Sequence, residues 1–538
     1  MPTLDWIGKD KIINYHRNVP YCVLDRIYSY DSKGQHEEDN GSENMIIHGD
    51  NLYALKSLLP KYEGKIKCIY IDPPYNTGNE KWVYNDNVND PQIRKWLGEI
   101  VGKEGEDMTR HDKWLCMMYP RLKLLQQLLS QDGAIFISIS DVEVSHLKLL
   151  CDEVFGAFNF ITIAPKKGSG GRQDSKHYSI VHEFVIVYAK SKQLFDVGRD
   201  QKEIKMTKFD SIRNKYYKTQ LLRKWGDGSR REDRPNLYYP LYFDILHNQL
   251  SVKQMNTSDI EIYPKLSDGK DGRWRWEKNN MQQHIDQGNV EIITEDENFI
   301  AYERLYEDEV TNTKPYSTWI DDNFESGTTS LSRMFPSVDF PYPKSVDYIE
   351  HLIQMCTCDC DCTVLDSFAG TGTTGHAVIN LNNKGGNRKF ILIEMMDYAE
   401  SITAQRIKFV IDGYCSESHI NSSFSYYELG NQIMNEEFIN EDVPIDKIRE
   451  YVFYTETKTS FVALNPEFKY YLGKKDLTAY YFCYEKDKMV SLDESIIAHI
   501  EPGFDNYVVY ADVCYLSSSY LKKHNIVFKK IPRDIGRF

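Results

Sequence analysis

The sequence lacks the features that mark membrane-spanning, secreted and disulfide-stabilised proteins. No apolar run approaches the roughly 20 residues needed to span a bilayer. The start, MPTLDWIGKDKI, is charged where a signal peptide would be hydrophobic. The 11 cysteines are odd in number and scattered over 538 residues, which fits reduced thiols better than a disulfide framework. These absences predict a cytoplasmic protein with no membrane contact.

An excess of positive charge is also missing, since the formal net charge is -15. Proteins that bind nucleic acids need Lys and Arg for phosphate contacts, so local distribution matters more than the total. Residues 202–234 hold roughly twice as many basic as acidic side chains, whereas residues 435–446 are strongly acidic. We expect a basic working surface on an acidic body.

Four cysteines alternate in the segment CTCDCDC, at Cys356, Cys358, Cys360 and Cys362. Structural zinc sites use C-x2-C pairs brought together by a turn. Alternate residues of an extended segment instead point along one face. We interpret the cluster as a connection that enters a buried strand, and we predict no metal site.

The order of apolar and polar segments predicts an α/β protein with two additional regions. Strand-like and helix-like segments alternate over residues 45–153 and again over residues 342–413. The segment between them is rich in Gly, basic and aromatic residues, and β-prone runs joined by acidic stretches follow residue 422. We expect these parts: an N-terminal extension (1–40), two catalytic segments (41–190 and 336–421), an inserted domain (191–335) and a C-terminal domain (422–538).

The segment VLDSFAGTGTTGHAV joins an apolar strand that ends at Asp366 to a helix through Gly370, Gly372 and Gly375. Glycines there let the backbone turn tightly and approach a ligand, and an acidic residue about 20 positions later can hold ribose hydroxyls. Glu394, which closes the strand FILIE, fits that role. By itself this motif suits a nicotinamide-dinucleotide enzyme equally well, or a glycine-rich turn without a ligand.

The segment KCIYIDPPYNTGNE places Asp72, Pro73, Pro74 and Tyr75 directly after an apolar strand, where ligands bind in open α/β sheets. The lone pair of adenine N6 is delocalised into the ring, so the amine needs two hydrogen-bond acceptors before it becomes a good nucleophile. The Asp72 carboxylate and the Pro73 carbonyl can supply them, because a proline-rich turn fixes where that carbonyl points. The Tyr75 ring offers a stacking face for a base flipped out of the duplex. The alternative is an ordinary Asp-Pro turn with a surface tyrosine.

Together with IIHGDNLYALKSL and HDKWLCMMYPRLKLL, the two motifs resemble the β-class amino-methyltransferases, and closely the Mod subunits of type III restriction-modification systems. The resemblance covers most of the chain. It implies a mostly parallel, circularly permuted, seven-stranded Rossmann-like sheet with an inserted target-recognition domain. It further implies transfer of a methyl group from S-adenosylmethionine to adenine N6 in double-stranded DNA.

The family roles carry over as follows. Asp72, Pro73, Pro74 and Tyr75 match the catalytic motif. The positions that match cofactor-binding residues are Asp50, Lys344, Asp366, Phe368, Gly370, Gly372 and Glu394. Lys344 is followed by Ser where the family usually has Lys-Pro, and Ser367 replaces a proline of the common DPFAGSGTT loop.

Basic residues of the insertion are the expected DNA contacts: Arg223, Lys224, Arg230, Arg231, Arg273 and Arg275. In GRWRWEK, Trp274 and Trp276 interleave with arginines and either stack on bases or form the buried face of a strand. The loop that holds Lys166, Lys167, Arg172 and Lys176 either folds onto DNA or is solvated.

The resemblance implies a homodimer, with the C-terminal domain as the interface, and a helicase-nuclease restriction subunit as a further partner. Three other functions stay open: N4-cytosine methylation, a catalytically silent DNA-binding specificity subunit, and a dinucleotide oxidoreductase. In the family DPPY accompanies adenine more often and SPPY cytosine, and DPPY has no role in an oxidoreductase. The recognition sequence cannot be deduced, because it depends on which side chains reach the base edges.

Overall fold

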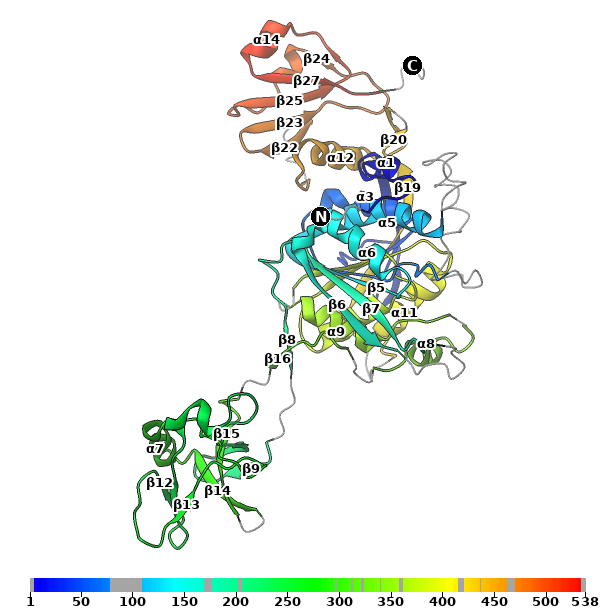
Figure 1. The fold of residues 1–538 in the computed structure, drawn as a ribbon. Helices are drawn as coiled ribbons and strands as arrows, with labels where there is room; N and C mark the ends of the chain where they lie inside the picture. Colours follow the sequence, from blue (N-terminus) through cyan, green and yellow to red (C-terminus); the bar gives the residue numbers. More distant parts are fainter. Residues whose placement is uncertain are drawn as a thin grey trace. The chain divides into compact units, whose positions relative to one another are not determined.

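A computed structural model describes most of the chain and divides it into two compact units, Met1–Gly198 with Tyr316–Phe538, and Arg199–Pro315 (Figure 1). The described residues are 4–77, 109–168, 177–201, 206–295, 298–310, 313–320, 324–338, 340–357, 361–414, 420–435, 437–461 and 470–533. None of the helices in these ranges has the length and apolar character that crossing a membrane requires.

One sheet of ten strands organises the first unit. In spatial order its strands are β2 (Gly34–His36), β1 (Cys22–Asp31), β19 (Ser423–Gln432), β3 (Met45–His48), β18 (Lys389–Glu394), β17 (Thr363–Asp366), β4 (Ile66–Ile71), β5 (Leu129–Ile139), β7 (His182–Ala189) and β6 (Phe160–Lys167). From β19 to β5 all neighbours pair in parallel, and the pairs at both edges are antiparallel. The expected α/β class with a mostly parallel sheet is confirmed.

The expected strand number is wrong, because β2, β1 and β19 extend the sheet beyond β3. The expected boundaries at residues 40 and 422 would leave β1 and β19 outside the sheet, whereas β19 pairs with β3 over four residues. Aromatic pairing holds the added strands, since the rings of Tyr28 and Tyr426 stack at 5.1 Å between centroids. The added strands also cover the backbone groups of β3 that would otherwise form an open edge.

Helices cover both faces of the sheet. This agrees with the inner strands, which are apolar at nearly every position because both of their faces are buried. One core packs α3 (Asn51–Tyr62), α5 (Arg110–Leu128) and α6 (Val144–Cys151) on one face. The other core packs α9 (Val346–Cys356), α10 (Thr373–Asn383) and α11 (Gln405–Ile411) on the opposite face. Strand β4 contributes Ile69 and Ile71 to the first core and Cys68 and Tyr70 to the second. This alternation fixes its register and directs the end of the strand into the candidate site.

The remaining described elements of the first unit follow β19. A four-stranded sheet has the order β22 (Tyr471–Lys475), β23 (Thr478–Phe482), β25 (Asn506–Ala511), β27 (Ile526–Lys530), with α12 (Ile445–Thr457) against β22. Lys65, beyond α3, donates to Ser460 Oγ at 2.6 Å, which ties this region to the central sheet. In the cysteine segment, Cys356 ends α9 and Cys362 precedes β17, while Cys358 and Cys360 lie outside the described residues.

The second unit lies within the insertion expected at residues 191–335. Its four-stranded sheet has the order β14 (Val290–Glu295), β15 (Asn298–Tyr306), β10 (Lys215–Leu221), β9 (Lys208–Asp210). A three-stranded sheet has the order β12 (Gln249–Ser251), β11 (Leu241–Asp244), β13 (Ile260–Ile262), and α7 (Lys278–Asp286) follows it. At the two ends of the unit, β8 (Arg199–Gln201) and β16 (Thr313–Pro315) pair antiparallel.

Candidate active site

The two sequence motifs meet at one edge of the central sheet. Strands β4 and β17 are parallel neighbours, with Leu365 opposite Ile69. Asp72 follows β4, and Asp366 ends β17. Because the carboxyl ends of parallel strands share one edge, Asp72 of the first motif and the glycine loop of the second line a single pocket. Its walls are formed by Tyr70, Asp72, Phe340, Tyr342, Pro343, Lys344, Asp366, Phe368, Ala369, Gly370, Thr371, Thr373 and Thr374.

The Asp72 carboxylate is buried beside the ammonium of Lys344, with 3.3 Å between Nζ and Oδ1. Burial raises the pKa of Asp72 above its usual value, although the neighbouring Lys344 charge opposes the rise. Lys344 also donates to the Tyr75 hydroxyl at 2.7 Å and lies over the Tyr75 ring, 4.9 Å from its centroid. The structure therefore places this lysine, expected at the cofactor, in contact with the DPPY residues.

Glu183, the second residue of β7, completes this group, and the sequence motifs do not include it. It accepts from the Tyr75 hydroxyl at 2.8 Å and from Lys344 at 2.9 Å. Its other oxygen accepts from Lys166 at 2.9 Å. Burial favours the neutral acid, yet the two ammonium groups hold the pKa of Glu183 well below its usual range. The signal in the sequence was a lone acidic residue at the start of the apolar run HEFVIVYA.

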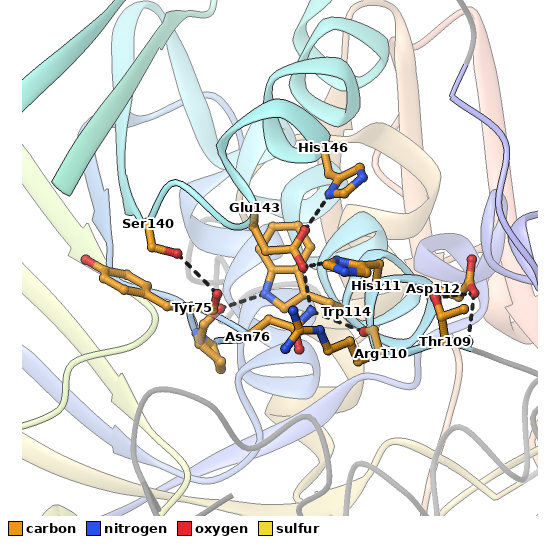
Figure 2. Close-up of polar contacts among 11 residues, drawn as sticks. Tyr75, Asn76, Thr109, Arg110, His111, Asp112, Trp114, Ser140, Glu143 and His146 are labelled. Carbon is orange, nitrogen blue, oxygen red and sulfur yellow. Dashed lines mark hydrogen bonds and ion pairs between the residues drawn. The ribbon is translucent and has the colours of Figure 1, made fainter. Parts of the chain in front are cut away.

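Side chains that follow the DPPY turn in the sequence form hydrogen bonds with the turn and with Asn76 (Figure 2). The indole Nε1 of Trp114 donates to the Pro74 carbonyl at 2.7 Å. Asn76 has a φ of 54°, a conformation that asparagine tolerates better than most residues, and its amide donates to Glu143 at 2.5 Å. The hydroxyl of Ser140 donates to the Tyr75 carbonyl at 3.4 Å. These contacts fix the direction in which the turn presents its backbone.

The glycine loop is shaped by its own packing as much as by access for a ligand. Gly370 and Gly372 have φ values of 53° and 78°. A Cβ at position 372 would lie 3.0 Å from the Thr403 carbonyl oxygen, so a larger residue would need Thr403 to move and would be strained by the positive φ. Asp366 holds the loop closed, because it accepts from the Phe368 amide at 3.0 Å and from the Thr374 hydroxyl at 2.5 Å.

Two further acidic residues lie where the sequence predicts them, at the ends of β18 and β3. Glu394 accepts from the backbone amides of Gly370 and Met396 at 2.8 and 3.0 Å. Burial raises the pKa of Glu394 to about 7, and it does the same for Asp366. Asp50 caps α3 and pairs with Arg121 at 3.0 Å. A cluster of acids that resist ionisation suits a site completed by a positively charged ligand.

The basic residues expected to contact DNA fall into two groups within the second unit. Arg230 and Arg231 are exposed, although Arg231 pairs with Asp271 at 3.2 Å. Arg273 donates to the Gly228 carbonyl at 2.5 Å, and Arg275 pairs with Glu303 at 2.6 Å. Arg223 and Lys224 are half-buried, and their backbones pair with the RWRW segment.

Of the two interpretations left open for Trp274, a stacking platform for bases or the buried face of a strand, the structure supports the buried face. Its side chain is only 2% exposed and belongs to the core of the second unit. Its Nε1 donates to the Tyr239 carbonyl at 2.8 Å. Trp276 stacks on His284, with 3.8 Å between ring centroids. In the basic loop, Arg172 and Lys176 lie outside the described residues, and Lys166 faces Glu183.

Comparison with known proteins adds sequence matches to this geometry. The model of the N6_N4_Mtase family, described as "DNA methylase", matches residues 66–405. The EcoPI Mod subunit of a type III restriction-modification enzyme, from Escherichia phage P1, is 34% identical over 73% of this chain and 63% of its own. The type II methyltransferase M.KpnI from Klebsiella pneumoniae is 35% identical over 66% of this chain and 81% of its own. This chain therefore spans less than two thirds of the EcoPI Mod subunit. The solved M1.HpyAVI-SAM complex aligns with 67% of this chain and 98% of its own, at 13% identity and a TM-score of 0.31, which adds nothing to the sequence matches.

Proposed function

The chain belongs to the DNA methylase family whose model matches residues 66–405, and from that membership we propose that it methylates adenine N6 in double-stranded DNA with S-adenosylmethionine as the methyl donor. One observation carries the proposal. Asp72 of the DPPY turn and the residues of the glycine loop, far apart in the chain, line the same pocket at the ends of adjacent strands. A methyltransferase needs this arrangement, since the donor and the acceptor amine must meet in one place.

The residues around the glycine loop fit the cofactor. Ser367 Oγ is buried and has no hydrogen-bond partner within the described residues. The two oxygens of Glu394 accept from the backbone amides of Gly370 and Met396, and a carboxylate of this kind is suited to accept from ribose hydroxyls as well. The raised pKa values of Asp366 and Glu394, both about 7, fall when a cation binds beside them. When bound, the cofactor supplies an electrophilic methyl group on a sulfonium whose positive charge matches this acidic surface.

The chain's own residues orient the acceptor amine. The Asp72 carboxylate accepts one N6 hydrogen and the Pro73 carbonyl accepts the other, while the Tyr75 ring stacks on the flipped base. The hydroxyl of Tyr75 is held by Glu183 and Lys344, so the ring has one orientation before the base arrives. Lys344 already occupies hydrogen-bonding space beside Asp72. An incoming amine therefore competes with the ammonium for this carboxylate.

The decisive experiment is base-resolved sequencing of DNA from cells that express this chain alone. Methylated adenine at one sequence supports the proposal, whereas methylated cytosine would identify an N4-cytosine enzyme. We expect Asp72→Ala to abolish methylation while S-adenosylmethionine still binds by calorimetry, because the carboxylate orients the amine. Near-normal methylation by that variant would show that the catalytic assignment is wrong.

We further propose that the second unit reads the DNA sequence, with the exposed Arg230 and Arg231 at its contact surface. Relatives of this chain are named as Mod subunits, and so as parts of larger type III enzymes, while M.KpnI is named as a type II enzyme. For this chain we propose a homodimer and a helicase-nuclease partner. Light scattering of the purified chain tests the dimer, and an active monomer would contradict it. Co-purification with a restriction subunit encoded beside it tests the partner.

A further inference from the structure

Three side chains with metal-binding atoms converge behind the DPPY turn (Figure 2). His111 is the second residue of α5, Glu143 caps α6, and His146 is its third residue. The Nδ1 atoms of the two imidazoles lie 2.5 and 2.9 Å from separate oxygens of the Glu143 carboxylate. One potential ligand atom from each of the three residues lies within 4.8 Å of those of the other two.

The Glu143 side chain is 0% exposed, whereas the imidazoles are 33% and 36% exposed. A buried carboxylate is costly unless a positive charge compensates it. Neutral imidazoles satisfy its hydrogen bonds but leave its charge in place. A cation held among the three side chains would compensate that charge. The partly exposed imidazoles would let the cation reach the site from solvent.

We propose that His111, Glu143 and His146 bind one divalent transition-metal ion, with zinc as the best match. Two imidazole nitrogens and one carboxylate oxygen form a ligand set typical of zinc, and three protein ligands leave a fourth position for water. The spacing Glu-x-x-His places two ligands on one side of a helix start, as in carboxylate-bridged metal proteins, and α5 supplies the third. This site departs from the absence of metal expected from the sequence.

The ion would connect the metal site to the proposed catalytic turn. Glu143 accepts from the amide of Asn76, the residue after Tyr75. Oxygen Oε1 of this carboxylate accepts from Asn76 and also faces His111 Nδ1, so a metal bound to the carboxylate would link α5, α6 and the turn. The proposed role of the ion is therefore to position the turn.

The test is zinc binding by the untagged, full-length chain after removal of metals with a chelator and dialysis. Calorimetric titration with ZnCl₂ should show one zinc per chain, and cobalt(II) should give the visible absorption of a four-coordinate site. His146→Gln keeps a hydrogen-bond donor toward Glu143 but removes a ligand, so zinc affinity should fall by at least about 10-fold to 100-fold, the loss already caused by removing a residue that only supports a ligand. His247→Gln is the matched control, because His247 pairs with Asp244 at 2.7 Å in the second unit and belongs to no cluster of three metal-binding residues in the described part of the chain.

Two results would overturn the proposal. Equal zinc affinity in His146→Gln and His247→Gln would indicate nonspecific surface binding. Failure of the wild-type chain to take up zinc would also overturn it. If His146→Gln then has a lower melting temperature than the wild type, the three side chains form a hydrogen-bonded cluster only. His111→Gln provides a second ligand variant if one of them fails to fold, as circular dichroism would reveal. DNA and methyl donor are absent from these titrations, so their outcome is independent of the proposed methyl transfer.

Discussion

Replacing Lys344 with methionine should move the acidic limb of the pH–activity profile to higher pH. The ammonium lies 3.3 Å from Asp72 Oδ1, and it lowers the pKa of a carboxyl that burial has raised. At an effective dielectric constant of about 20, two unit charges at this distance interact by about 5 kcal/mol, which is an upper bound. Opposite charges this close shift a pKa by about 1 to 3 units. We therefore expect the limb in Lys344→Met to rise by about 1 to 3 pH units.

The sign follows from the role proposed for Asp72. The ionised carboxylate is a hydrogen-bond acceptor only, whereas the protonated acid carries a proton on one oxygen. The ionised form is therefore the active one. When the neighbouring cation is lost, the pKa of Asp72 rises, and the active form is reached only at higher pH. Activity at neutral pH should therefore fall and then recover in part as the pH increases. Full recovery is not expected, because Lys344 also holds the Tyr75 hydroxyl.

The assay is the initial rate of labelled methyl transfer to DNA, measured as kcat/KM across pH for matched variants. Lys344→Arg keeps the charge and should keep the limb in place. Lys166→Met removes a cation that pairs with Glu183 rather than with Asp72. This substitution should therefore move the acidic limb less than Lys344→Met does. If Lys344→Met and the wild type share the same limb, either Asp72 does not titrate in the working enzyme or Lys344 is not its partner there.

Three further predictions rest on separate parts of the structure. Burial raises the pKa of Asp366 to about 7, above its value of 3.8 in the unfolded chain. As pH rises between these values, Asp366 ionises in the unfolded chain but not in the folded one, so the folded state loses stability. Asp366→Asn should therefore raise the melting temperature of the cofactor-free protein at pH 8, with a gain that shrinks toward pH 5; equal gains at both pH values would contradict this. Trp114→Phe removes the bond to the Pro74 carbonyl, and it should cost about 1–2 kcal/mol in urea unfolding and slow methyl transfer without weakening cofactor binding. Wild-type rates in that variant would show that the bond does not position the turn. Exchange of residues 199–315 for the matching unit of a relative should change the methylated sequence while chemistry is kept; a folded, active chimera that still methylates the original site would refute the recognition role.

The sequence predicts the centre of the sheet and the positions of the motif residues well. Buried parallel strands read as apolar runs, so β4, β17 and β18 are recognisable, and the first polar residue after each run marks a strand end. Asp72, Asp366 and Glu394 could therefore be placed at one edge before any coordinates were known. Local patterns determine where each strand ends, and the parallel arrangement brings these ends to one edge.

Contacts that depend on sheet order could not be predicted in the same way. Glu183 meets Lys344 only because β7 is the neighbour of β5, and no local pattern encodes that pairing. The added strands β1 and β19 pair although about 400 residues separate them, so no local pattern indicates that both belong to the central sheet. Trp274 was ambiguous for a related reason. Alternation of Arg and Trp describes a strand with two faces, and only packing decides which face is buried.

The order of the two motifs along the chain does not affect the pocket they form. Strands β4 and β17 are parallel neighbours, so their carboxyl ends meet at one edge whichever strand comes first. What the order changes is where a long insertion can enter. The chain leaves the first unit at β8 and returns to it after β16. These two strands pair with each other, so the two ends of the second unit lie side by side. An insertion with adjacent ends adds little loop-closure entropy to the first unit. Its surface can therefore diverge while the strands that carry Asp72 and Asp366 keep their register.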